Sequence, residues 1–201
     1  RRSSDLEVAA LRAGIDHGLT VIDTAEMYAD GGAEEVVGQA IRGLRDRVVL
    51  VSKVYPWHAG GTAMRRACEN SLRRLQTDYL DMYLLHWRGD IPLQETVEAM
   101  ERLVAEGKIR RWGVSNLDTE DMQALWRTAD GEHCATNQVL YHLASRGIEY
   151  DLLPWCQQHT LPVMAYCPLA QAGRLRDGLF QHTDIINMAN ARGVTVAQLL
   201  L

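Results

Sequence analysis

Residues 18–28 of this chain read GLTVIDTAEMY, a short apolar run that stops at an aspartate. The run Thr20–Ile22 has the β-branched composition of a buried strand, and Asp23 and Tyr28 follow it. A charge at the end of a buried strand either lies at the open end of the sheet or is buried at considerable cost. We therefore predict a strand that delivers polar side chains to a site at its carboxyl end.

Five further stretches repeat this design. Apolar runs alternate with amphipathic segments at intervals of about 25 to 33 residues, enough for one strand and one crossover helix. The predicted strands are Thr20–Ile22, Val48–Lys53, Tyr79–His86, Trp112–Ser115, Thr136–Leu140 and Val163–Tyr166. This order predicts an α/β fold with parallel strands and helices packed outside the sheet.

The segments between the strands show helical signals. The helix after the second strand should pack through one face, made of Met64, Ala67, Cys68, Ser71, Leu72 and Leu75. Asp118 or Thr119 is placed to cap a later helix. Near the end of the chain we predict helices over 183–192 and 195–201, separated at Gly193.

An open doubly wound sheet and a closed barrel both fit this alternation. No Gly-x-Gly-x-x-Gly turn follows any strand, so the usual dinucleotide-binding fingerprint is missing. Polar residues end many different strands, and a barrel gathers all of those ends into one site. We therefore predict a TIM-type (β/α)8 barrel, with about six of its eight βα units in this chain.

The composition is that of a soluble globular protein, with 47% hydrophobic residues among 201 and a formal net charge of −5. The acidic balance argues against nucleic acid or an anionic membrane as a partner, because both favour basic patches. No apolar run is long enough to span a bilayer, and residues 1–7 have no leader-like apolar segment. The four cysteines form no Cys-x-x-Cys pair and have no metal-ligand spacing, which predicts free thiols in a reducing cytoplasm and no metal site.

Four polar side chains near the first three strand ends have the composition of an acid catalyst. They are Asp23, Tyr28, Lys53 and His86. A tyrosine phenol ordinarily has a pKa of about 10, and a nearby ammonium lowers it. A carboxylate keeps such a lysine charged, and a histidine can orient a carbonyl oxygen toward the phenol. Each residue alone has a structural alternative, a turn cap for Asp23 or a core contact for His86, but their occurrence together favours proton delivery during hydride transfer.

The later strand ends carry groups that suit a nicotinamide ring. Amide and hydroxyl groups for its carboxamide are offered by Ser115, Asn116 and Gln138. Tyr166 offers a flat face on which the ring can stack. Trp57 and Trp87 are predicted to wall an apolar substrate pocket. Two alternatives stay open, in which Asn116 caps the following helix and Trp87 plugs the fold.

Six stretches of the chain resemble the aldo-keto reductase family, in the same order and at similar spacing. They are GLTVIDTAEMY (18–28), VLVSKV (49–54), DYLDMYLLHW (78–87), IRRWGVSNL (109–117), ATNQVLYH (135–142) and VMAYCPLA (163–170). The resemblance covers essentially the whole chain. It implies NADPH/NADP+ as cofactor, hydride transfer to the carbonyl carbon of a small aldehyde or ketone, and protonation by the tyrosine.

The resemblance also assigns roles to residues. The family's catalytic tetrad falls on Asp23, Tyr28, Lys53 and His86, and its nicotinamide contacts fall on Ser115, Asn116, Gln138 and Tyr166. The loop with Leu169 and Gln171 resembles the segment that runs along the pyrophosphate. Cys167 stands where the family more often has serine, so its side chain is not expected to bind the cofactor. The sequences of residues 25–38, 52–61 and 138–156 resemble those of a bacterial branch of the family that reduces methylglyoxal.

Compared with the eight strands of the family, residues 1–201 are expected to form a single barrel domain that lacks some parts. These are the N-terminal hairpin with the first strand, and the last strand with the basic segment that clamps the adenosine 2′-phosphate. The residues fix neither the natural substrate nor the oligomeric state. Two other functions also stay open. A non-catalytic relative acting as a regulatory subunit would hold NADPH without turnover. An isomerase or aldolase with Lys53 as a Schiff base would be trapped on its substrate by borohydride.

Overall fold

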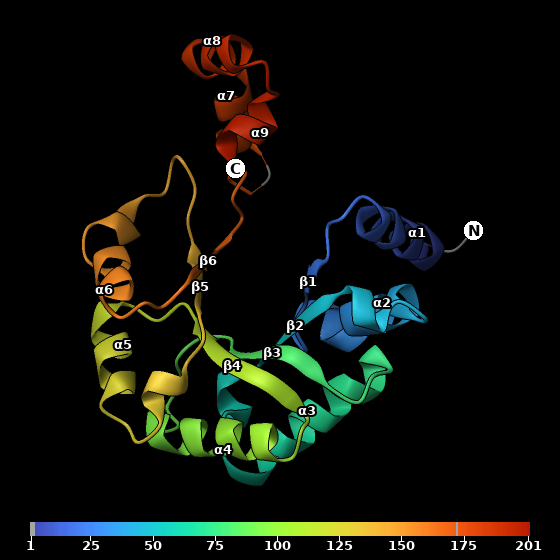
Figure 1. Cartoon of the computed structure of the whole chain (residues 1–201), viewed down its shortest axis with the longest axis vertical. Helices are drawn as coiled ribbons and strands as arrows, with labels where there is room; N and C mark the ends of the chain where they lie inside the picture. Colours follow the sequence, from blue (N-terminus) through green and yellow to red (C-terminus); the bar gives the residue numbers. More distant parts are fainter. Residues whose placement is uncertain (1–2, 172) are drawn as a thin grey trace. The chain divides into compact units, whose positions relative to one another are not determined.

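The computed structural model describes residues 3–171 and 173–201. These residues form two compact units, one reaching to Thr136 and the other running from Asn137 to Leu201 (Figure 1). Within the described ranges, no helix has both the length and the apolar character needed to cross a membrane.

The first unit is built on four strands, β1 (Val21–Asp23), β2 (Val49–Val54), β3 (Leu80–Leu85) and β4 (Ile109–Ser115). Each strand pairs in parallel with the next one along the chain, for example Val21 with Val49, and Val51 with Met82. Because all four run in the same direction, their carboxyl ends lie at the same end of the sheet. The residues that follow those ends can therefore form one site.

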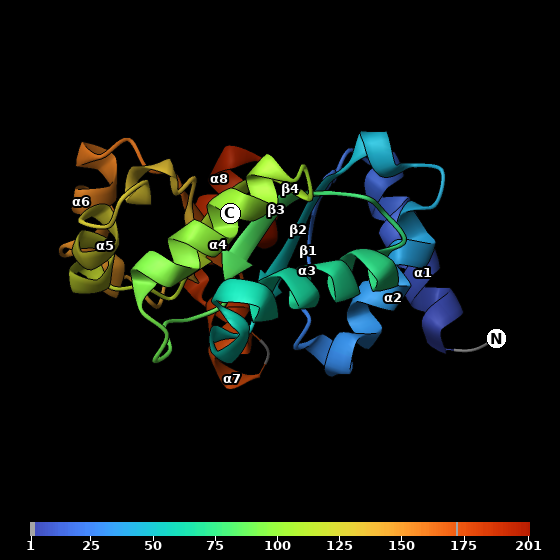
Figure 2. The same cartoon turned by 90° about the horizontal axis from the view of Figure 1, so that it is seen from below.

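Five helices belong to this unit: α1 (Ser3–Asp16), α2 (Gly32–Ile41), α3 (Gly61–Leu75), α4 (Leu93–Ala105) and α5 (Thr119–Trp126). Figures 1 and 2 show α2, α3 and α4 side by side along one face of β1–β4. The predicted face of α3 is confirmed, since Met64, Ala67, Cys68, Ser71, Leu72 and Leu75 are its buried residues. Short 3-10 turns connect the elements: η1 (Tyr28–Gly31), η2 (Arg45–Arg47), η3 (Pro56–His58) and η4 (Gly131–His133).

The core of the first unit lies between its strands and these helices. Leu50 and Tyr83 have no exposed surface. Trp112 is 1% exposed, and its indole N–H donates to Glu101 Oε1 at 2.7 Å. A well-packed sheet of this kind gives the strand-end side chains a rigid base.

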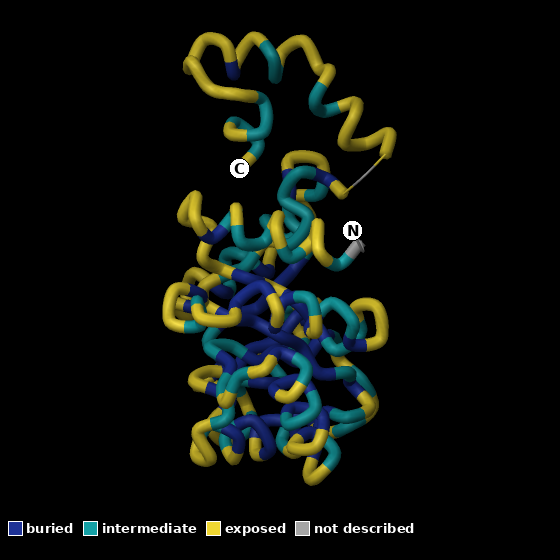
Figure 3. The backbone as a smooth tube through the Cα atoms, turned by 90° about the vertical axis from the view of Figure 1, so that its right-hand side faces the viewer, coloured by how far each residue is buried: buried dark blue, intermediate teal, exposed yellow. Residues whose placement is uncertain are grey.

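The second unit contains a parallel pair, β5 (Asn137–Leu140) and β6 (Val163–Tyr166), with Gln138 paired to Met164. Between the strands lie η5 (Gly147–Glu149) and α6 (Leu152–Gln158). Three helices follow, α7 (Arg174–Gln181), α8 (Thr183–Arg192) and α9 (Val196–Leu200). Their residues are largely exposed (Figure 3). Gly193 ends α8 with a left-handed φ of 66°, and Thr195 caps α9, which confirms the break predicted there.

All six predicted strands are present, with small shifts at their ends. The largest shift is in β4, which begins at Ile109 rather than at the predicted Trp112. Arg110 stacks on the Tyr79 ring at 4.3 Å and pairs with Asp81 at 3.2 Å. These partners accommodate the charged Arg110 side chain within β4. The charge of Arg110 therefore led the sequence analysis to place the start of this strand too late.

Candidate active site

The four residues predicted to be catalytic meet at the carboxyl ends of β1, β2 and β3. Lys53 Nζ donates to Asp23 Oδ2 at 2.6 Å, to the Thr24 carbonyl oxygen at 2.9 Å and to the Tyr28 hydroxyl at 3.4 Å. The Lys53 side chain is fully buried, whereas Asp23 is 33% exposed and Tyr28 is 36% exposed. A buried ammonium is thus held between a carboxylate and a phenol that faces solvent.

The local sequence explains why Lys53 tolerates burial. An ammonium group has three N–H donors, and leaving them unpaired away from water is costly. Residues 23–28 supply one acceptor for each donor, so the charge is compensated and its position is fixed. The turn just after Tyr28 is strained, because Ala29 and Asp30 have left-handed φ values of 51° and 52°. Such strain is typical of functional sites.

His86 completes this group from the end of β3. Its ring lies edge-on to the Tyr28 ring, with centroids 5.8 Å apart and planes at 80°. Burial and the nearby Lys53 charge lower the pKa of His86 to about 4, with Asp23 acting in the opposite direction. The imidazole is therefore neutral near pH 7. Its buried Nδ1 atom has no hydrogen-bond partner among the described residues.

Asn116 links the site to β4. Its φ of 59° is left-handed, a conformation that asparagine adopts more readily than most residues. The side-chain amide donates to the His86 carbonyl oxygen and to Ser115 Oγ, both at 3.1 Å. The alternative role of Asn116 as a helix cap is wrong, because Asp118 caps α5 by accepting from the Asp121 N–H at 2.8 Å. Two residues predicted to contact the nicotinamide, Ser115 and Asn116, therefore adjoin His86.

The other two residues predicted to contact the nicotinamide ring, Gln138 and Tyr166, lie in the second unit. Gln138 is buried in β5, and its amide nitrogen lies 2.8 Å from Met164 Sδ. Tyr166 is the last residue of β6 and is half-buried. Tyr166 therefore lies at the carboxyl end of its strand, as the sequence predicted, whereas Gln138 is the second of the four residues of β5 and not at its carboxyl end.

The predicted pyrophosphate loop follows Tyr166 and has an irregular backbone. Leu169 is half-buried and Gln171 is exposed. Left-handed φ values occur at Cys167 (51°), Ala170 (61°) and Gln171 (47°). A short loop with this many left-handed residues is sharply turned, which exposes backbone groups that regular structure would pair.

A cluster of aromatic rings stands next to His86 in the first unit. The Tyr55 and Trp57 rings stack 4.3 Å apart at 20°, and Trp87 lies edge-on to both, at 6.0 and 5.9 Å. His86 lies 4.9 Å from Trp87 between ring centroids. Trp57 is 59% exposed, and Trp87 is half-buried. We call Tyr55, Trp57 and Trp87 the aromatic wall.

Known proteins resemble this chain over nearly its whole length. The sequence model described as "Aldo/keto reductase family" matches residues 2–198. The chain belongs to the aldo/keto reductase family. Methylglyoxal reductase YeaE of Escherichia coli is 69% identical over 195 residues, which make up 97% of this chain and 69% of that protein. Aldo-keto reductase YhdN of Bacillus subtilis is 39% identical over 82% of this chain and 52% of its own length.

A solved structure agrees with this assignment. The aldo/keto reductase of Klebsiella pneumoniae, in complex with NADP and acetate, is 95% identical and superposes with a TM-score of 0.94. The match covers 98% of this chain and 70% of that one, so this chain spans between 52% and 70% of the relatives named here. The predicted family, the α/β fold class and the enzyme class of an aldo-keto reductase are confirmed.

Sequence reasoning missed two residues beside this aldo-keto reductase site. Tyr55 is the centre of the aromatic wall, and Glu26 accepts a hydrogen bond from the Tyr55 backbone N–H at 2.7 Å. Their positions in the sequence could have marked them, because Tyr55 follows Lys53 by two residues and the charged Glu26 lies between Asp23 and Tyr28. Only the long-range pairing was invisible, because it depends on how two loops meet.

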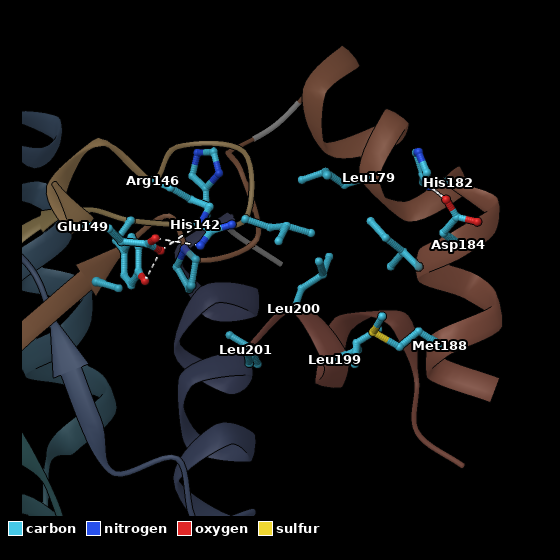
Figure 4. A pocket seen from close by; sticks show the side chains of 15 residues that line it. His142, Arg146, Glu149, Leu179, His182, Asp184, Met188, Leu199, Leu200 and Leu201 are labelled. Atoms are coloured by element: carbon cyan, nitrogen blue, oxygen red, sulfur yellow. Dashed lines mark hydrogen bonds and ion pairs between the residues drawn. The ribbon is translucent and has the colours of Figure 1, made fainter. Parts of the chain in front are cut away.

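A pocket of 730 Å³ in the second unit is a different feature (Figure 4). Its polar groups satisfy one another, since Glu149 accepts two hydrogen bonds from Arg146 and one from Tyr141. These bonds lower the pKa of Glu149 to about 2. None of the predicted catalytic or cofactor residues lines the pocket, so it is not our candidate site. Across 3–171 and 173–201, no group of three or more His, Cys, Asp or Glu side chains is placed to hold a metal.

Proposed function

We propose that this chain is the catalytic part of an NADPH-dependent reductase that converts small aldehydes or ketones to alcohols. The observation that carries the proposal is the buried Lys53 ammonium, bonded at once to Asp23 and to the Tyr28 hydroxyl beside a neutral histidine. The Tyr28 phenol is 36% exposed, so a carbonyl substrate can reach its proton from solvent.

The chemistry divides among the four residues. When bound, NADPH would supply the hydride for the carbonyl carbon. The neutral His86 ring donates a hydrogen bond that orients the carbonyl oxygen, and the Tyr28 hydroxyl gives its proton to that oxygen as negative charge develops there. Lys53 stabilises the tyrosinate that remains, and Asp23 keeps Lys53 in place.

The residues suit the cofactor that the family uses. The buried Ser115 hydroxyl and the exposed Asn116 side chain, which donates to the His86 carbonyl oxygen, can hold a carboxamide. We assign the same role to Gln138, a stacking role to Tyr166, and the pyrophosphate to the loop with Leu169 and Gln171. Support comes from the Klebsiella pneumoniae relatives at 95% identity, solved with NADP and with NADPH.

Methylglyoxal or a related small reactive aldehyde is the substrate that we propose. Support comes from the Escherichia coli methylglyoxal reductase, which is 69% identical over most of this chain. The aromatic wall beside His86 offers an apolar surface for the part of the substrate that does not react. We assign Trp57 and Trp87 to the wall of the substrate site, and the half-buried state of Trp87 favours this role over that of a core plug.

Neither of the two other functions finds support. A regulatory relative without turnover has no need of a tyrosine, lysine, aspartate and histidine in hydrogen-bonding order. An aldolase needs a lysine whose nitrogen is available to attack, and the Lys53 nitrogen is fully buried and engaged with three acceptors.

We also propose the cytoplasm as the place of the reaction, with a small-molecule carbonyl as the partner. The structure forms no disulfide among its four cysteines, which suits a reducing compartment.

The direct test follows NADPH absorbance with methylglyoxal and purified protein, alongside a titration of NADPH binding. Oxidation of NADPH that depends on methylglyoxal is the expected result. NADPH binding without turnover of any aldehyde would instead establish the regulatory alternative.

A further inference from the structure

Glu26 is a nearly buried carboxylate that the proposed chemistry does not use. It lies in the turn between Asp23 and Tyr28, and its side chain is 9% exposed. Its Oε1 atom accepts from the Tyr55 backbone N–H at 2.7 Å and lies 3.2 Å from His58 Nδ1. One carboxylate oxygen therefore joins the turn that carries Tyr28 to residues 55–58.

Residues 55–58 carry two of the three rings of the aromatic wall. Tyr55 stacks on Trp57, and its other ring contacts are with His58 and Trp87. The buried Pro56 and a hydrogen bond from Thr96 Oγ1 to the Ala59 carbonyl oxygen at 2.7 Å hold the far end of the loop, while Trp57 and His58 remain 59% and 37% exposed. Glu26 adds the tie between Tyr55 and the turn that carries Tyr28.

The contacts of Glu26 are separate from those that hold the catalytic groups. Lys53 is bonded to Asp23, Thr24 and Tyr28, and none of these bonds involves the Glu26 side chain. The Glu26 backbone N–H does donate to the Lys53 carbonyl oxygen at 3.4 Å, and a side-chain substitution leaves that bond intact. Removing the carboxylate should therefore move the wall and leave the acid catalyst in place.

We propose that Glu26 is a positioning residue that sets the aromatic wall and so determines how well flat, apolar carbonyl substrates bind. The inference rests on the proposed reductase function. A planar aldehyde such as benzaldehyde gains most from ring faces held at a fixed distance from His86 and Tyr28. Methylglyoxal has little apolar surface and gains less binding energy from the wall. Benzaldehyde therefore reports on the wall, and methylglyoxal reports on the chemistry.

The test compares Glu26→Ala, Glu26→Gln and a matched control, Glu35→Ala, which removes an exposed carboxylate from α2. For Glu26→Ala we expect KM for benzaldehyde to rise about tenfold, the effect of losing one charge-assisted hydrogen bond. We expect KM for methylglyoxal and both kcat values to stay within about twofold. Glu26→Gln keeps an acceptor for the Tyr55 N–H and should restore most of the benzaldehyde binding.

A second readout needs no substrate. The stacked Tyr55 and Trp57 rings give a near-ultraviolet circular dichroism signal, which we expect Glu26→Ala to weaken and Glu35→Ala to preserve. If Glu26→Ala does not fold, His58→Ala takes its place, because it removes a partner of both the Glu26 carboxylate and the Tyr55 ring, and a smaller rise in KM for benzaldehyde is expected. Benzaldehyde KM and spectrum both matching the Glu35→Ala control would overturn the proposal, as would a fall in kcat with KM unchanged. Failure of the wild type to reduce either aldehyde would overturn the reductase function, while the spectrum would still decide whether Glu26 positions the wall.

Discussion

At the scale of single residues, Tyr28 is the group whose loss should separate chemistry from binding. Tyr28→Phe removes only the hydroxyl that accepts from Lys53 at 3.4 Å, and the ring can keep its edge contact with His86. We expect turnover to fall by about 10² to 10⁴, the usual contribution of a general acid. The dissociation constant of NADPH should change little. Equal losses in turnover and in NADPH affinity would remove Tyr28 from the acid role.

The lowered pKa of His86 predicts how the stability of the protein depends on pH. Burial and Lys53 lower its pKa from 6.5 in the unfolded chain to about 4 in the fold. Between these two values the unfolded chain binds more protons, so stability contributed by the neutral histidine is present above pH 6.5 and is lost as pH falls toward 4. The loss is on the order of 2 to 3 kcal/mol.

The comparison variant is His86→Gln, a neutral side chain that does not titrate. Urea unfolding at pH 7 and at pH 4.5 should show a smaller drop in the free energy of unfolding for His86→Gln than for wild type. The same drop in both proteins would show that His86 is not the titrating group.

At the scale of elements, Asp81 ties together the beginnings of three strands. Its Oδ2 accepts from the Leu50 N–H at 2.9 Å and from Arg45 Nη2 at 2.8 Å, and its Oδ1 lies 3.2 Å from Arg110 Nη1. The guanidinium groups of Arg45 and Arg110 both lie over the Tyr79 ring, at 3.9 and 4.3 Å. This cluster sits at the amino ends of β2, β3 and β4, away from the candidate active site.

We expect Asp81→Ala to lower the free energy of unfolding by about 2 to 3 kcal/mol, because it leaves a mostly buried Arg45 charge and the Leu50 N–H without this acceptor. Asp16→Ala is the control, since its ion pair with Arg47 is exposed and should contribute less than about 1 kcal/mol. Urea unfolding gives both values. The kcat/KM of Asp81→Ala at low temperature should equal that of wild type, and a large loss there would mean that the cluster also shapes the active site.

Elements also show what the sequence could and could not predict. The strands and the buried face of α3 followed from local periodicity, and Gly193 marked the end of α8. Helix α7 was not predicted, because it has only eight residues and includes Gly178, a residue unfavourable in a helix. The tetrad could be placed because each member lies at or just beyond a strand end. Glu26 could not, since its partner is a backbone N–H almost thirty positions away.

At the scale of the whole molecule, binding of the cofactor is coupled to folding of the chain. A ligand that binds only the folded chain stabilises it by about 2.7 kcal/mol at a concentration one hundred times its dissociation constant. NADPH should therefore raise the unfolding midpoint of the protein, by an amount that grows with the logarithm of the ratio of its concentration to its dissociation constant.

Gln138→Ala tests whether the nicotinamide contact proposed for Gln138 contributes to that binding. Losing one hydrogen bond to the cofactor weakens affinity roughly tenfold, so at the same NADPH concentration the stabilisation should shrink by about 1.4 kcal/mol. Gln157→Ala removes an exposed glutamine from α6 and serves as the control. Because Gln138 is buried against Met164, its loss also lowers stability without NADPH, and only the difference caused by NADPH is diagnostic. An undiminished NADPH effect in Gln138→Ala would mean that the nicotinamide contact assigned to Gln138 by family resemblance is wrong for this chain.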